Sequence, residues 1–196
     1  RLIAWAETYN VFCCLNNNNF NTPYHTYNII VAVGVHKHYT ASVTTKEKGR
    51  IFSEIKNFLQ QQQNIVFGHI AYDLKNDIEQ LTSNNIDYLH FPDTYLFTPE
   101  IVLKINEKTV EIECINTSFT AEEVLQEINN ISPLTPITKF KGKVQCRTSK
   151  EEYIYAFDKL KEHIQRGDIY EANFCQEFFV ENIPIHPGEL YLQLNN

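Results

Sequence analysis

The sequence predicts an α+β fold in which antiparallel strands alternate with helices. Several short apolar runs have the length of a strand, and two of them flank a turn as in a hairpin. Two other stretches carry apolar residues at helical spacing directly after a capping box. The chain has 196 residues, 43% of them hydrophobic, so it can bury a substantial core in one large domain or two small ones.

The N-terminal part is expected to alternate helices with short buried strands. Apolar side chains at helical spacing predict helices over residues 1–9 and 51–59. Asp73 is expected to cap a further short helix. Apolar runs predict strands at residues 11–15, 27–35, 38–44 and 65–72.

A hairpin is expected next, with strands at residues 95–105 and 109–115 around Asn106 and Glu107. Its second strand should turn Val110, Ile112 and Cys114 inward. The capping box at Thr120 then opens a helix. Residues 132–138 contain two prolines and are the best candidate for a linker.

The second capping box, at Ser149, opens a longer helix that should end at Gly167. Its expected buried stripe is Tyr153, Phe157, Leu160 and Ile164. Residues 168–181 are then expected to form one long strand. A helical pattern begins again before Leu194.

Charge and cysteine content narrow the function classes. A net charge of −7 and a pI of about 5.5 argue against binding to nucleic acid or to an anionic membrane. No apolar run approaches the ~20 residues that a membrane span needs. The five cysteines are scattered and lack a C-x-x-C pair, so we expect a cytoplasmic protein without a disulfide framework or a zinc site.

Three segments in order along the chain carry a resemblance to a known family. They are Leu15–Asn17 with Tyr24–Ala32, then Gly68–Leu74 with Glu79, then Arg147–Gln176 with its Gly-Asp-Ile-Tyr element. Together they resemble component I of anthranilate synthase and of aminodeoxychorismate synthase, which are chorismate-binding enzymes. The resemblance implies an antiparallel β-sandwich with helices outside and an active site between its halves.

The resemblance also implies that only the N-terminal part of that fold is present. Residues 1–138 would be the N-terminal region and residues 139–196 the truncated start of the chorismate-binding catalytic domain. The chain lacks methionine and stops at Asn196, so we expect a fragment. The catalytic residues and the glutamates that bind magnesium are expected downstream of Asn196. The chain should therefore hold no metal and be inactive alone.

Two residues of the last segment are expected to face the substrate site, Glu171 and Asn173. In the related isochorismate and salicylate synthases a lysine holds the position of Glu171 and activates water. A carboxylate cannot easily replace that lysine near a dianionic substrate. This difference disfavours addition of water and leaves addition of ammonia. The alternative is an ordinary exposed glutamate on a strand.

An amino-acid pocket is the other site that the resemblance implies. Asn17 stands where the family has a serine that belongs to the element through which tryptophan inhibits anthranilate synthases. Tyr24, His25, Thr26 and Tyr27 follow the contacting stretch. Loss of the serine puts tryptophan binding in doubt and favours folate synthesis over tryptophan synthesis. The alternative is a plain loop and strand of the core.

The expected function is that of component I of aminodeoxychorismate synthase. It would convert chorismate and ammonia, supplied by a glutaminase partner, to 4-amino-4-deoxychorismate with magnesium as cofactor. One alternative is component I of anthranilate synthase. The other is a non-catalytic module that binds an amino acid for regulation.

Overall fold

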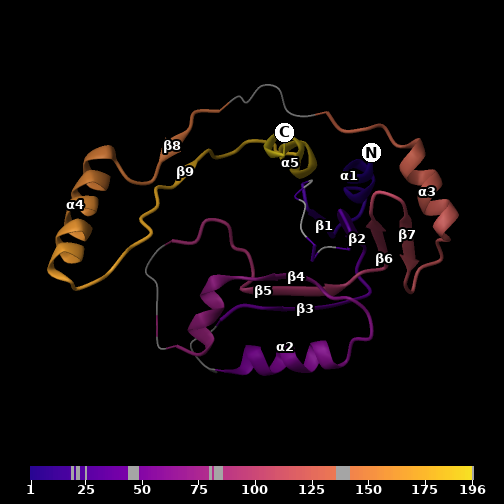
Figure 1. Cartoon of the computed structure of the whole chain (residues 1–196), viewed down its shortest axis with the longest axis horizontal. Coiled ribbons are helices and arrows are strands. Elements are labelled where there is room, and N and C mark those ends of the chain that lie inside the picture. The colour runs from indigo at the N-terminus through magenta and orange to yellow at the C-terminus, as the bar shows by residue number, and fades with distance from the viewer. Residues whose placement is uncertain are drawn as a thin grey trace. The chain divides into compact units, whose positions relative to one another are not determined.

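A computed structural model describes residues 1–18, 20, 23–24, 26–43, 49–79, 81, 86–135 and 142–195 of the chain. Apart from the last two residues, the chain divides into two compact units, Arg1–Leu134 and Thr135–Leu194 (Figure 1). The expected linker lies partly outside the described residues. The assignment of the two parts to an N-terminal region and the start of a catalytic domain stays a prediction.

The first unit contains two antiparallel sheets. The first sheet has the order β1 (Phe12–Asn16), β2 (Ile29–Val33), β6 (Ile101–Ile105) and β7 (Val110–Cys114). The second has the order β3 (Lys37–Ala41), β5 (Thr94–Thr98) and β4 (Phe67–Ile70). Its helices are α1 (Leu2–Ala6), α2 (Arg50–Gln60), the 3₁₀ helix η1 (Tyr72–Asp77) and α3 (Ala121–Asn130).

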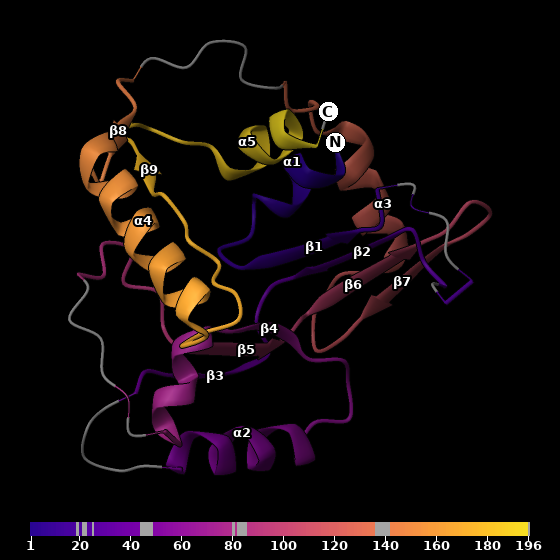
Figure 2. The same ribbon diagram turned by 60° about the vertical axis from the view of Figure 1, so that its left-hand side comes forward.

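The alternation of side chains along the central strands creates four layers. On β2, Val31 and Val33 pack with Trp5 of α1 and Val124 of α3. Ala32, between them, packs on the other face against Phe67 and Phe97 of the second sheet. The outer face of that sheet is covered by α2 and η1, through residues that include Ile51, Ile55 and Leu74. The predicted antiparallel sandwich with helices outside is confirmed (Figure 2).

The chain passes from one sheet to the other twice, at neighbouring places. Gly34 joins β2 to β3 with φ 73°, and a Cβ there would lie 2.5 Å from a carboxylate oxygen of Glu100. Residues 99–100 join β5 to β6, and the N–H of Glu100 donates to the carbonyl of Val33 (3.0 Å). The two corners are thus hydrogen-bonded to each other.

The expected strand at residues 95–105 is wrong, because the structure has two strands there that belong to different sheets. Pro99 lies at the break, where its missing N–H cannot continue a ladder. The hairpin itself is formed by β6 and β7. Of the three β7 residues expected to face inward, Ile112 is half-buried, whereas Val110 and Cys114 are exposed. The reason is that β7 lies at the edge of its sheet.

Asp73 does not cap a helix. It lies in the first turn of η1, and its carboxylate pairs with Lys75 at 3.0 Å. A neighbouring carboxylate, that of Asp77, caps a different helix, α2. Asp77 is buried and accepts a hydrogen bond from the N–H of Ile51 (3.1 Å) at the start of α2. A negative group at this place also matches the positive end of the helix dipole.

The second unit contains β8 (Gln145–Cys146), α4 (Lys150–Arg166), β9 (Phe178–Phe179) and α5 (Pro187–Leu194). Both predicted capping boxes are confirmed, and Gly167 ends α4 in the left-handed conformation, with φ 81°. The expected buried stripe on α4 is wrong, because no residue of this helix is buried.

The expected strand at residues 168–181 is also wrong. Only Phe178 and Phe179 pair, with the two residues of β8. A strand needs a neighbour that accepts and donates its backbone hydrogen bonds. In the described part of this unit, β8 offers such a neighbour to two residues only.

Gly68 tests how closely the strands of the second sheet approach each other. Its φ is 144°, and a Cβ there would lie 1.9 Å from the carbonyl oxygen of Tyr95. Gly68→Ala should therefore lower the free energy of unfolding by about 3 kcal/mol, measured by urea denaturation. Gly49→Ala is the matched control, because φ is also positive there (74°) but a Cβ would meet no atom of the described residues within 4 Å. It should cost only about 1 kcal/mol, and equal losses would contradict the close approach.

Candidate functional site

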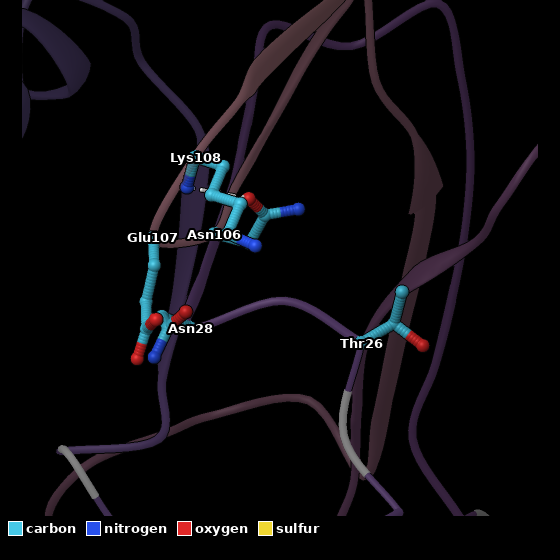
Figure 3. A pocket seen from close by; sticks show the side chains of 5 residues that line it. All are labelled: Thr26, Asn28, Asn106, Glu107 and Lys108. Atoms are coloured by element: carbon cyan, nitrogen blue, oxygen red, sulfur yellow. Dashed lines mark hydrogen bonds between the residues drawn. The ribbon is translucent and has the colours of Figure 1, made fainter.

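A polar hollow of about 280 Å³ lies at the turn between β6 and β7 (Figure 3). It is lined by Thr26, Asn28, Asn106, Glu107 and Lys108. The N–H of Asn28 donates to the carbonyl of Ile105 (2.7 Å), which holds the segment before β2 against the hairpin. The side-chain oxygen of Asn106 accepts from the N–H groups of Lys108 and Thr109 (both 2.9 Å) and thereby fixes the turn.

A cluster of charged side chains adjoins Tyr27. The Tyr27 hydroxyl donates to the carboxylate of Glu111 (3.0 Å), and the Lys104 ammonium lies 5.9 Å from the centre of its ring. Lys104 also forms an ion pair with Glu113. The hydrogen bond to Glu111 raises the pKa of Tyr27, because a phenolate could not donate it and would face a negative carboxylate.

Sequence reasoning missed Lys104, Glu111 and Glu113. A signal for them was present, since Glu111 and Glu113 alternate on one face of the second hairpin strand. In the hairpin register Glu111 stands directly opposite Lys104.

The residues predicted for the amino-acid pocket are only partly brought together. Thr26 lines the hollow, and the N–H of Asn17 donates to the carbonyl of Asn28 (2.9 Å) beside it. Tyr27 contacts Glu111 instead, and Tyr24 is 93% exposed. His25 lies outside the described residues.

A second hollow, of about 430 Å³, lies at the start of α4 in the second unit. The ring of Tyr153 forms part of it and stacks on Phe174, with 4.6 Å between ring centres. The Gln176 amide donates to the carbonyl of Thr148 (2.7 Å) and closes another side. Its full lining is Cys146, Thr148, Ser149, Lys150, Tyr153, Gln176 and Phe178.

Glu171 and Asn173 are exposed on the irregular segment that follows α4. They line neither of the two hollows described above. Their place at a substrate site stays a prediction.

No group of three or more His, Cys, Asp and Glu side chains in the described part of the chain could hold a metal ion. The described residues therefore do not supply a set of donors for magnesium. Among the described helices, none is both long and apolar enough to cross a membrane.

Comparison with known proteins decides the family. Residues 13–196 match the chorismate binding enzyme family, which is most of the chain. The chain belongs to this family. The family predicted from the sequence is thereby confirmed, and all three segments that carried the resemblance lie within the matched range.

Two curated relatives of this chain have names that refer to anthranilate synthase component I. Anthranilate synthase component 1 of Cereibacter sphaeroides is 24% identical over 148 residues, which cover 66% of this chain and 29% of the relative. The anthranilate synthase component I-like protein of Synechocystis sp. is 26% identical over 120 residues, which cover 58% of this chain and 24% of the relative. The matches thus span less than a third of either relative's length.

The cluster at Tyr27 gives a test by titration. Glu111→Gln should lower the pKa of Tyr27 toward its ordinary value, because it removes the carboxylate that favours the protonated phenol. The pKa can be followed by NMR with ring-labelled tyrosine. Glu113→Gln is the matched control and should move it less, since Glu113 bonds to Lys104 rather than to Tyr27. An unchanged Tyr27 pKa in Glu111→Gln would contradict the hydrogen bond.

The capping box of Ser149 and Glu152, beside the second hollow, gives another test by titration. Hydrogen bonds from Ser149 to the Glu152 carboxylate hold its pKa below the ordinary range. This cap therefore stabilises the folded chain above the ordinary glutamate pKa, and the contribution is lost as the pH falls through the lowered one. Ser149→Ala should raise the Glu152 pKa in an NMR titration. The pKa of Glu123, lowered by its own cap at Thr120, should not move.

Proposed function

We propose that this chain is part of component I of an aminodeoxychorismate synthase, a cytoplasmic enzyme of folate synthesis. The complete enzyme would convert chorismate and ammonia to 4-amino-4-deoxychorismate. A glutaminase partner would supply the ammonia, and magnesium would bind to residues other than those described. The family match over residues 13–196 is the observation that carries the proposal.

Glu171 supports ammonia rather than water as the nucleophile. Water must lose a proton to attack, and a neutral lysine amine is a good base for that purpose. A carboxylate carries the same sign of charge as the dianionic substrate and does not readily take over the role of that lysine. Neutral ammonia attacks without a base. The exposed positions of Glu171 and Asn173 are compatible with contact to a ligand.

Asn17 supports amination at C4 of chorismate rather than at C2. An amide here replaces the hydroxyl that the resemblance places in the tryptophan-binding element. Feedback by tryptophan serves tryptophan synthesis, so a chain without this element fits the folate branch better.

Component I of anthranilate synthase is the second candidate. One curated relative carries that name and the other is named as a component I-like protein, and this observation favours amination at C2 with release of pyruvate.

A regulatory module that binds an amino acid is the third candidate. The hollow at the hairpin turn favours it, because Glu107 could pair with an ammonium group and Lys108 with a carboxylate. Calorimetry of the chain with tryptophan tests this candidate, and tight binding would also favour anthranilate synthase.

An amination assay separates these functions. The product of the complete gene is incubated with chorismate, magnesium and an ammonium salt, with and without aminodeoxychorismate lyase. We expect 4-aminobenzoate only when the lyase is present. The control is the same mixture with lyase but without the gene product.

Each other result has a definite meaning. Anthranilate and pyruvate formed without the lyase would establish the second candidate. If no aminated product forms and chorismate is not consumed, both enzymatic hypotheses would be overturned. The regulatory module that binds an amino acid would then remain.

A further inference from the structure

Three polar side chains meet at the end of α4. The Asp168 carboxylate oxygen Oδ2 lies 2.8 Å from Nη2 of Arg166 and 2.7 Å from Nδ1 of His163. Nη2 of Arg166 also lies 2.8 Å from Nδ1 of His163. The carboxylate of Asp168, the second residue after α4, is thus held by two side chains of the last helical turn.

The backbone is fixed at the same place. Gly167 adopts φ 81°, and its N–H donates to the carbonyl of Ile164 (3.0 Å). The N–H of Asp168 donates to the carbonyl of His163 (3.0 Å). Both the main chain and the side chain of Asp168 are therefore attached to α4.

The segment that follows is attached again a few residues later. Phe174 stacks on Tyr153 near the start of α4, and its carbonyl accepts from the Tyr153 hydroxyl (3.4 Å). Residues 169–173 bridge the two attachments, and Glu171 is the middle residue of this bridge. A bridge held at both ends has far fewer conformations than one held at a single end.

We propose that Asp168, held by His163 and Arg166, is a positioning residue that fixes residues 169–173 and so sets the place of Glu171. The inference rests on the proposed function for the role of Glu171. Asp168 itself touches no reacting atom in this scheme.

Of the two charges at this helix end, the helix dipole favours that of Arg166, and Arg166 in turn offsets the charge of Asp168. The cation of Arg166 lies in the last turn of α4, where it interacts favourably with the negative end of the helix dipole. Glu162, in the last turn but one, is paired with Lys159 at 2.9 Å. Each exposed ion pair stabilises the fold only weakly, so loss of the Asp168 carboxylate should change local order far more than global stability.

The first arm of the test measures order in this 196-residue chain by ¹⁵N relaxation. In the unchanged chain, residues 169–173 should have order parameters near the value of about 0.85 that marks a rigid backbone. Asp168→Ala should lower them below about 0.6. Asp168→Asn should restore most of the order, because its amide oxygen can still accept a hydrogen bond from Nδ1 of His163. Asp158→Ala, which removes an exposed carboxylate from the middle of α4, is the matched control and should change nothing.

The second arm measures amination of chorismate by the product of the complete gene. Asp168→Ala should lower kcat by up to about 10²-fold, the cost of a misplaced catalytic group, with a smaller change in KM. Asp168→Asn should recover most of kcat.

Three results would overturn the inference. Unchanged order in Asp168→Ala would show that the cluster does not hold the segment. Lost order with unchanged kcat would show that the segment needs no positioning for the reaction. Equal losses in Asp168→Asn and Asp168→Ala would show that the hydrogen bond between His163 and the side-chain oxygen of residue 168 does not hold the segment. An inactive unchanged enzyme would overturn the proposed function instead, and the relaxation arm would still decide whether Asp168 orders the segment.

Discussion

The antiparallel pairing of β2 with β6 is the interaction on which the rest of the first unit depends. Both strands bury both of their faces, one against α1 and α3 and the other against the second sheet. Each strand also continues directly into that second sheet, β2 through Gly34 and β6 backwards through residues 99–100. A slip of one residue in this pairing would exchange the two faces of a strand. The slip would turn Val31 toward the second sheet and Ala32 toward the helices α1 and α3. The register of this one strand pair therefore determines the packing of all four layers.

The second unit is stabilised by interactions of a different kind. Its helix α4 has no buried residue, whereas α2 and α3 each bury at least one apolar side chain. What defines α4 is local: the Ser149–Glu152 box at its start, Gly167 at its end, and contacts from the next segment to Tyr153 and the last turn. Local contacts open at a lower free energy than a packed core does. The segment that carries Glu171 therefore depends on a few specific contacts rather than on burial.

The sequence predicted those features whose partners lie within about four residues. The two capping boxes, the helical face of α2 and the stop at Gly167 are of this kind, because helix signals are short-range. It failed where the deciding partner is distant. Asp77 caps α2 from 26 residues away, and the strands at β5 and β6 separate because they pair in different sheets. At the candidate site Thr26 was predicted, but the turn residues Asn106, Glu107 and Lys108 come from a hairpin far along the chain. Periodicity alone predicted a strand at residues 168–181, although a strand also requires a partner edge.

Under the proposed function the substrate is a dicarboxylate, so the placement of charges on this chain bears on how that substrate could be bound. Many of its cations already contact carboxylates, including Lys104 with Glu113, Lys159 with Glu162, Arg147 with Glu177 and Arg166 with Asp168. A paired cation attracts a further anion weakly, because its partner cancels most of its field at a distance. With a net charge of −7, the chain as a whole would repel a dianion. Under the proposed function, charge neutralisation must then come from residues other than these pairs and from the metal. On that proposal this chain would contribute the placement of side chains such as Glu171, and the cation of Arg166 would serve that placement through its ion pair with Asp168.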